Sequence, residues 1–195
     1  SLHLGMLWVA IEATTFAGAP LIYFHRHHRS LEATWKYLLI CTVAVALAML
    51  GNYFLAAASM RSGIVIHLTV DDLRVHASRL DPAWLKAAFL LFLVGYGAKM
   101  GLAPMHNWLP DAHSEAPSVI SALLSGALLN CSFLAILRIL GVMDAAGLGV
   151  FGRDLLILFG LVSMGVAAVF FITQGDYKRM LAYSSVEHMG ILALG

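Results

Sequence analysis

Long apolar runs alternate with short polar segments along the chain. Five of the runs contain enough apolar residues to cross a bilayer core of about 30 Å, which takes a helix of about 20 residues. These runs cover residues 4–24, 37–58, 84–104, 118–140 and 154–173, and a sixth begins near residue 180. The runs are continuous rather than alternating, so they predict helices and not the strands of a membrane barrel.

The polar connections are mostly short. Residues 25–36 (HRHHRSLEATWK) and 174–179 (QGDYKR) are basic, which predicts a cytoplasmic position if the first run enters from outside. Residues 61–83 form the longest link and have room for a short amphipathic helix, although this link is also basic. The first residue is a serine and the last apolar run stops at residue 195, so we expect an internal fragment of a longer chain.

Composition supports a membrane protein. Of the 195 residues, 61% are hydrophobic and only 12% are charged, whereas soluble domains average about 25% charged residues. We therefore predict an all-α, multi-pass transmembrane bundle, a single domain over 1–195 with five complete helices and a truncated sixth. The net charge of +1 gives no indication of nucleic-acid binding. Neither a phosphate loop nor a dinucleotide or haem motif is present, and the two cysteines lie in apolar runs, so we expect no catalytic, cofactor or metal site.

Two charged residues fall where lipid is expected. Glu12 lies in the middle of the first run, and Lys99 lies in the third. A charge at that depth costs about 2.5–3.5 kcal/mol on insertion scales and usually faces a partner or a wet path. The alternatives are a protonated Glu12 bonded to a neighbouring hydroxyl and a Lys99 that extends to the membrane surface.

The segment after Lys99 predicts a broken helix. GAKMGLAPMHNWLPDAHSEAP (97–117) contains glycines and three prolines, which interrupt helical hydrogen bonding. It also gathers His106, Asp111 and His113, and Trp108 is of a type that suits a membrane interface. Histidine titrates near neutral pH, so the two histidines can pass protons between the break and water. The alternative is a solvated polar loop.

The fourth run carries a face of small polar residues. At about 100° per residue, four serines share one side of this helix (Ser118, Ser121, Ser125 and Ser132), which favours close helix packing. Asn130 projects about 160° away from them. As a polar residue at depth, it needs a partner or a water.

Two segments carry a resemblance to a known family. GAKMGLAPMHNWLPDAHSEAPSVISALLSGALLN and DYKRMLAYSSVEHMG resemble the antiporter-like, proton-translocating subunits of complex I, of Mrp antiporters and of energy-converting hydrogenases. WVAIEATT and SLEATWKYLLICTV are similar to the hydrogenase-4 component F branch. The resemblance implies a middle portion of a subunit of about fourteen helices, from the fifth helix to the start of the tenth.

The resemblance also implies roles for the polar residues. Glu12 and Lys99 would form the ion pair that modulates proton uptake, and the proton path would include His106, Asp111, His113 and Asn130. Many relatives have a lysine or histidine where this chain has Asn130. Asn cannot carry a proton near neutral pH, which leaves open whether that step passes through side chains or through water.

The functional expectation is a non-redox membrane subunit of a hydrogenase or formate-hydrogenlyase-type complex related to NADH:quinone oxidoreductase. It would sit in a prokaryotic cytoplasmic (inner) membrane and contact other membrane and peripheral subunits. Nickel–iron and iron–sulfur centres would belong to partner subunits, with no cofactor in this chain. The alternatives are an Mrp-type cation/proton antiporter subunit and a structural scaffold in which the charge pair only sets helix packing.

Overall fold

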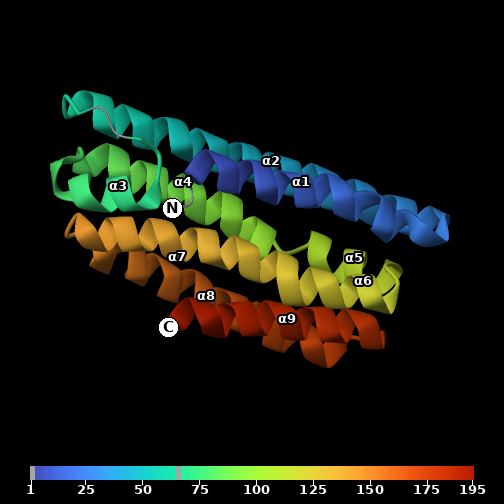
Figure 1. Cartoon of the computed structure of the whole chain (residues 1–195). Helices are drawn as coiled ribbons and strands as arrows, with labels where there is room; N and C mark the ends of the chain where they lie inside the picture. Colours follow the sequence, from blue (N-terminus) through green and yellow to red (C-terminus); the bar gives the residue numbers. More distant parts are fainter. Residues whose placement is uncertain (1–2, 65–66) are drawn as a thin grey trace.

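The computed structural model describes residues 3–64 and 67–195, and these ranges are almost entirely helical (Figure 1). The elements are α1 (Leu4–Ile22), η1 (Tyr23–His25), α2 (His28–Arg61), α3 (Val70–His76), η2 (Ala77–Arg79), α4 (Pro82–Met100), α5 (Trp108–Glu115), α6 (Ser118–Leu123), η3 (Leu124–Leu128), α7 (Leu129–Ala145), α8 (Gly149–Thr173) and α9 (Tyr177–Leu194). The long helices lie side by side, as the view in Figure 1 shows. The predicted all-α bundle is confirmed.

The five predicted spans are also confirmed. Among the described residues, five helices are long and apolar enough to cross a membrane: Leu4–His25, His28–Arg61, Pro82–Met100, Ser118–Ala145 and Gly149–Thr173. The second begins earlier than the predicted residue 37. His27 and Ser30 form a reciprocal cap in which each side chain accepts a hydrogen bond from the other's backbone N–H. This cap lets the polar segment from residue 28 onward join the helix.

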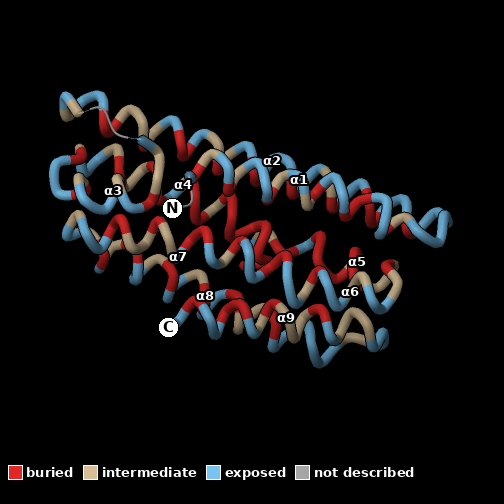
Figure 2. Tube along the Cα trace, in the orientation of Figure 1, coloured by how far each residue is buried: buried red, intermediate tan, exposed pale blue. Residues whose placement is uncertain are grey.

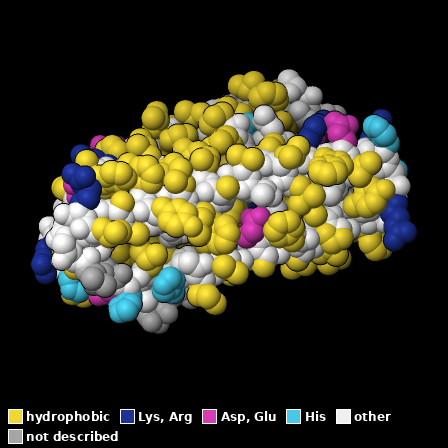
Figure 3. All heavy atoms as spheres, turned by 90° about the horizontal axis from the view of Figure 1, so that it is seen from above, with side chains coloured by type: hydrophobic (Ala, Val, Ile, Leu, Met, Phe, Trp, Pro, Cys, Tyr) yellow, Lys and Arg dark blue, Asp and Glu magenta, His cyan; other side chains and the backbone are white. Residues whose placement is uncertain are grey.

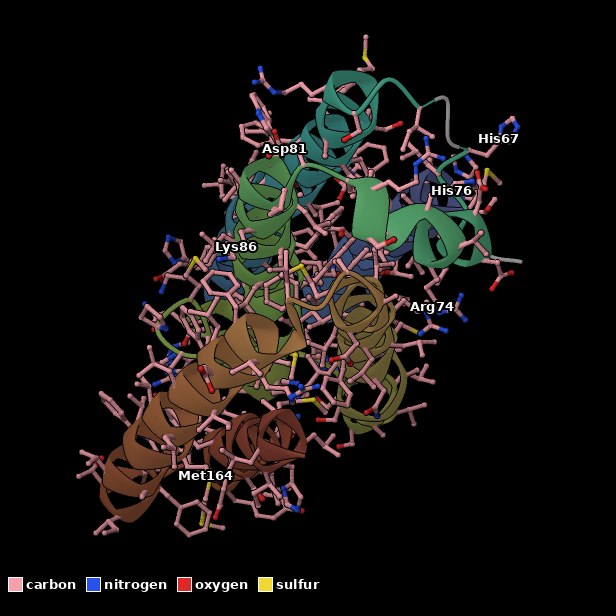
Figure 4. All side chains as sticks on the ribbon, turned by 90° about the vertical axis from the view of Figure 1, so that its left-hand side faces the viewer. His67, Arg74, His76, Asp81, Lys86 and Met164 are labelled. Atoms are coloured by element: carbon pink, nitrogen blue, oxygen red, sulfur yellow. The ribbon has the colours of Figure 1, made fainter. Side chains whose placement is uncertain are left out.

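The longest polar link contains the expected short helix, α3. It packs against α7, with the guanidinium of Arg74 resting on Gly141 of that helix. Figure 4 looks at this end of the bundle, where His67, Arg74, His76, Asp81 and Lys86 are labelled. Polar side chains thus gather at this end of the bundle, as expected where a membrane protein meets water.

Helix α4 occupies the centre of the bundle. It packs along α2 on one side and α7 on another, and Figure 2 shows buried residues concentrated along it. At Gly95 the α2 backbone comes so close that an added Cβ would lie 2.5 Å from the Ala44 carbonyl oxygen. The small residue permits this close approach between the two helices.

The outer surface is largely apolar. Exposed hydrophobic side chains cover the outward faces of α1, α2 and α8, among them Phe16, Leu39, Val43, Val169 and Ile172. In Figure 3 hydrophobic side chains fill the middle of the molecule, and most charged groups gather toward its ends. This distribution suits a protein whose middle faces lipid or further apolar helices.

Candidate functional site: a buried lysine at a helix break

The predicted break follows directly after Lys99. Helix α4 ends at Met100, and Gly101 adopts a positive φ of 87°. The N–H of Leu102 donates to the Gly97 carbonyl at 2.8 Å, closing the helix end. Ala103–Pro104 is a cis peptide, and helix resumes only at Trp108. Helical hydrogen bonding is therefore interrupted between Gly101 and Trp108, as the Gly and Pro pattern predicted.

Side chains satisfy the backbone groups that the break leaves free. The N–H of Ala103 donates to Ser163 Oγ of α8 at 2.9 Å. The indole Nε1 of Trp108 donates to the Ala98 carbonyl at 2.9 Å. Trp108 is fully buried, so its indole packs inside the bundle rather than on its surface, and its depth relative to the membrane interface stays a prediction. The indole lies inside because its N–H caps a carbonyl at the end of α4.

Lys99 is fully buried beside the break. Its Nζ donates to Thr15 Oγ1 at 2.7 Å and to the Tyr37 hydroxyl at 3.2 Å. The Tyr37 ring packs against Trp108, with ring centroids 5.2 Å apart. Residues from α1, α2, α4 and α5 thus hold one ammonium group. Lys99 does not reach the surface, which excludes the alternative of a lysine extended to the membrane surface.

Glu12 lies one hydroxyl group away from this lysine. Its Oε2 is 3.5 Å from Thr15 Oγ1, the same oxygen that accepts from Lys99. Within the described part of the chain, no ion pair joins Glu12 directly to Lys99. The resemblance implied an ion pair between these two residues. The structure brings their side chains together with the Thr15 hydroxyl between them.

The two histidines of the predicted path are buried in the α4–α5 segment. His106 is 6% exposed and His113 is 4% exposed. His106 Nδ1 and His113 Nε2 form no hydrogen bond with the described residues. Burial lowers the pKa of both imidazoles, which lie outside the five spanning helices, and brings that of His113 to about 4. Burial therefore favours the neutral form of both imidazoles near pH 7.

Asp111 lies apart from the buried lysine, at the end of the bundle. Its carboxylate accepts from Lys36 Nζ of α2 at 2.8 Å and from the guanidinium of Arg179 of α9. Glu32 also pairs with Lys36, at 2.7 Å. These groups line a cleft of about 310 Å³ together with Arg29, Ser114, Glu115 and Asp176. Asp111 thus joins the short helix α5 to two long helices.

Asn130 does not join the buried lysine. It lies on the exposed side of α7, where its Nδ2 donates to the Gly126 carbonyl of the preceding turn at 2.8 Å. Asn130 thus faces away from the buried side of the helix, which agrees with its predicted position away from the serine face, and its predicted part in the proton path stays a prediction. The π turn η3, Leu124–Leu128, precedes it in the chain.

Sequence reasoning missed Thr15 and Tyr37, the two residues that contact the Lys99 ammonium. Thr15 follows Glu12 by three positions, which places both side chains on one face of a helix. That spacing is a signal by which Thr15 could have been found. Tyr37 gives no comparable signal, because it stands at the start of an apolar run where an aromatic residue is ordinary.

Metal binding needs several ligand side chains close together among the described residues. Within 3–64 and 67–195, no three His, Cys, Asp or Glu side chains gather in a way that could hold a metal ion. The arrangement around Lys99 instead offers a buried cation, a hydroxyl bridge and a carboxylate. Such a set can hold a charge away from water and alter the proton affinity of its members.

Two relatives are similar in sequence over nearly the whole chain. The chain is 41% identical over 194 residues to the "Hydrogenase-4 component F homolog" of Methylacidiphilum infernorum, covering 98% of this chain and 40% of the relative. It is 34% identical over 193 residues to the "NADH-quinone oxidoreductase subunit N" of Deinococcus radiodurans, covering 97% and 37% of the two chains. The chain therefore spans about two fifths of the length of these relatives.

Two solved structures have the same fold. A chain of respiratory complex I from Thermus thermophilus with bound Aureothin matches with a TM-score of 0.79 and 28% identity, over 98% of this chain and 39% of that one. A chain of the membrane-bound sulfane sulfur reductase, an archaeal respiratory membrane complex, matches with a TM-score of 0.89 and 24% identity, over 98% and 38%. The family model "NADH:quinone oxidoreductase/Mrp antiporter, TM" matches residues 1–195. The chain therefore belongs to the NADH:quinone oxidoreductase/Mrp antiporter transmembrane family.

Proposed function

We propose that this chain carries part of a proton path in a membrane subunit of a hydrogenase or complex I-like assembly. The observation that carries the proposal is the fully buried Lys99, held beside a helix break with Glu12 one hydroxyl away. Burying a charge at such a break is costly. Charged residues in this position are typical of ion and proton pathways.

The path that we propose begins with the neutral histidines of the α4–α5 segment. His106 and His113 are buried, and each has a buried ring nitrogen without a described partner, so each can bind a water of the path. Lys99 and Glu12 form the central charge pair. Asp111 holds α5 in place at the end of the path, and a role for Asn130 depends on what covers its exposed side.

The redox chemistry belongs to other subunits under this proposal. The relatives include a hydrogenase-4 component and a quinone oxidoreductase subunit by name. Nickel–iron or iron–sulfur centres would lie in such partners, and their electron transfer would drive protons through this chain in a prokaryotic cytoplasmic membrane. This chain would supply no redox group of its own.

The test is proton translocation by the full-length subunit in its assembled complex. Membrane vesicles are followed with a pH-sensitive dye while the complex turns over, and proton uptake is divided by electron transfer. Lys99→Ala should lower this ratio at least about tenfold, the scale of a lost buried charge interaction. Lys86→Ala, on the same helix at its other end, is the matched control.

The outcomes separate the alternatives. An unchanged ratio in Lys99→Ala, as in Lys86→Ala, would support a scaffold in which the charge only sets helix packing. Proton movement that needs an opposing Na⁺ gradient and no electron transfer would support the cation/proton antiporter.

A further inference from the structure

Thr15 is the least expected member of the site around Lys99. It is fully buried in the middle of α1, and its hydroxyl oxygen accepts a 2.7 Å hydrogen bond from the Lys99 ammonium. A hydroxyl has one proton to donate and two lone pairs to accept with. Because Lys99 occupies an acceptor position, the single Thr15 proton stays free to point elsewhere.

Two acceptors compete for that proton at equal distance. Thr15 Oγ1 lies 3.5 Å from Glu12 Oε2 and 3.5 Å from the Ile11 carbonyl oxygen. Both contacts are long for a hydrogen bond between oxygens, whose usual distance is about 2.7–2.8 Å. Neither acceptor therefore holds the proton firmly, and a small rotation of the hydroxyl selects one or the other.

We propose that the Thr15 hydroxyl is a switchable bridge between Lys99 and Glu12. When its proton points to Glu12, one continuous hydrogen-bonded chain links ammonium to carboxylate. When it points to the Ile11 carbonyl, the chain is interrupted and the two charges are separated. This inference rests on the proposed function and assigns a further residue to the same site.

The bridge can also carry a proton. An Nζ–H bond of Lys99 breaks as its proton bonds to the Thr15 oxygen, and the original Thr15 O–H bond breaks as that proton bonds to Glu12 Oε2. The result is a neutral lysine, a protonated glutamate and a threonine that is chemically unchanged. The chain resets when Lys99 regains a proton from the path, Glu12 releases one to it, and the Thr15 hydroxyl rotates its hydrogen from Lys99 back toward Glu12.

The rest of the site supports this geometry. The Tyr37 hydroxyl, 3.2 Å from Nζ, is a second acceptor for the ammonium, and its own proton is directed to the Thr14 carbonyl at 3.4 Å rather than to Glu12. The neighbouring Thr14 differs sharply from Thr15. Its hydroxyl donates to the Ile11 carbonyl of its own helix at 2.6 Å and contacts neither charged residue.

The experiment compares isosteric substitutions in the full-length subunit of the assembled complex. Thr15→Val keeps the shape of the side chain and removes the hydroxyl. We expect it to lower proton uptake per electron about tenfold, the scale of one hydrogen bond to a charged group. Thr15→Ser restores the hydroxyl and should recover most of the uptake, and Thr14→Val should leave it unchanged.

The outcomes distinguish this inference from the proposed function. Equal uptake in Thr15→Val and Thr14→Val, with loss in Lys99→Ala, would overturn the bridge and leave the proton path standing. Full uptake in Lys99→Ala would overturn both. Should Thr15→Val fail to assemble, Thr15→Ala against Thr15→Ser makes the same comparison, and uptake that is equally low in both would refute a role for the hydroxyl.

Discussion

At the scale of single residues, the site depends on how a buried ammonium is stabilised. Lys99 has no direct carboxylate partner among the described residues and relies on two hydroxyl groups. A buried charge that is incompletely paired costs several kcal/mol in desolvation. Glu12, on the far side of Thr15, offsets part of that cost at longer range.

The first prediction concerns the coupling between Glu12 and Lys99. Glu12→Gln and Lys99→Ala should each impair proton uptake per electron in the assembled complex. The double variant should lose much less than the two single losses combined, because both changes remove the same interaction. Strict additivity in this double-mutant cycle would show that the two groups act independently.

At the scale of elements, the break is a defined structure. A positive-φ glycine ends α4, Ser163 binds a free N–H, and the Trp108 indole caps a free carbonyl. Irregular backbone at membrane depth persists only where such groups are satisfied. The element that carries Lys99 is thus rigid on both sides of the charge.

The second prediction tests the indole cap. Trp108→Phe should lower the free energy of unfolding by about 1 kcal/mol, because the buried Ala98 carbonyl loses the indole donor and keeps only the 3.2 Å hydrogen bond from the Gly101 N–H. The loss appears as a lower midpoint in the thermal unfolding of the detergent-solubilised complex. Trp35→Phe is the control, since Trp35 is 57% exposed. Equal midpoints in the two variants would contradict the cap.

The third prediction tests the close approach of α2 and α4. Gly95→Ala would place a methyl group 2.5 Å from the Ala44 carbonyl oxygen. The helices must separate, at a cost of about 1–3 kcal/mol. Gly165→Ala on α8 meets no atom within 4 Å and should not destabilise the protein. The same thermal unfolding assay compares them, and a matching midpoint for both would show that α2 and α4 tolerate a wider spacing.

At the scale of the whole molecule, ion pairs at the bundle end connect helices that are distant in sequence. Asp111 accepts from Lys36 of α2 and from Arg179 of α9, and so places α5 between them. The side chain of Asp111 is 17% exposed. Lys36 and Arg179 belong to the two basic segments, 25–36 and 174–179, that were predicted to lie on the same side of the membrane. The structure places both residues at the same end of the bundle.

The fourth prediction tests this connection. Asp111→Asn should lower the unfolding midpoint of the assembled complex by the equivalent of about 1–2 kcal/mol, more than an exposed pair is worth. The difference in unfolding midpoint between Asp111→Asn and the parent protein should shrink in high salt, because salt screens partly exposed charges. Asp144→Asn removes the more exposed pair with Arg153 and is the control. A larger loss in the control would contradict a special role for Asp111.

The sequence alone determined the elements and the place of the break. The spanning helices follow from continuous apolar runs, and the break after Lys99 follows from Gly101 and Pro104, because these signals act through neighbouring residues. The unusual positions of Glu12 and Lys99 were visible for the same reason. A charge within an apolar run is a local feature of the chain.

Only the tertiary structure decided which side chains meet. Thr15 and Lys99 are 84 positions apart, and their contact depends on the packing of α1, α2 and α4 rather than on local pattern. Helical spacing predicted that Asn130 points away from the serine face, and the structure adds that this side of the helix is exposed and that Asn130 bonds to the Gly126 carbonyl. The burial of Trp108 was also decided by tertiary structure, because the folded break brings its indole N–H to the Ala98 carbonyl at the end of α4. Such outcomes depend on how helices fit together in space, which no single run of residues encodes.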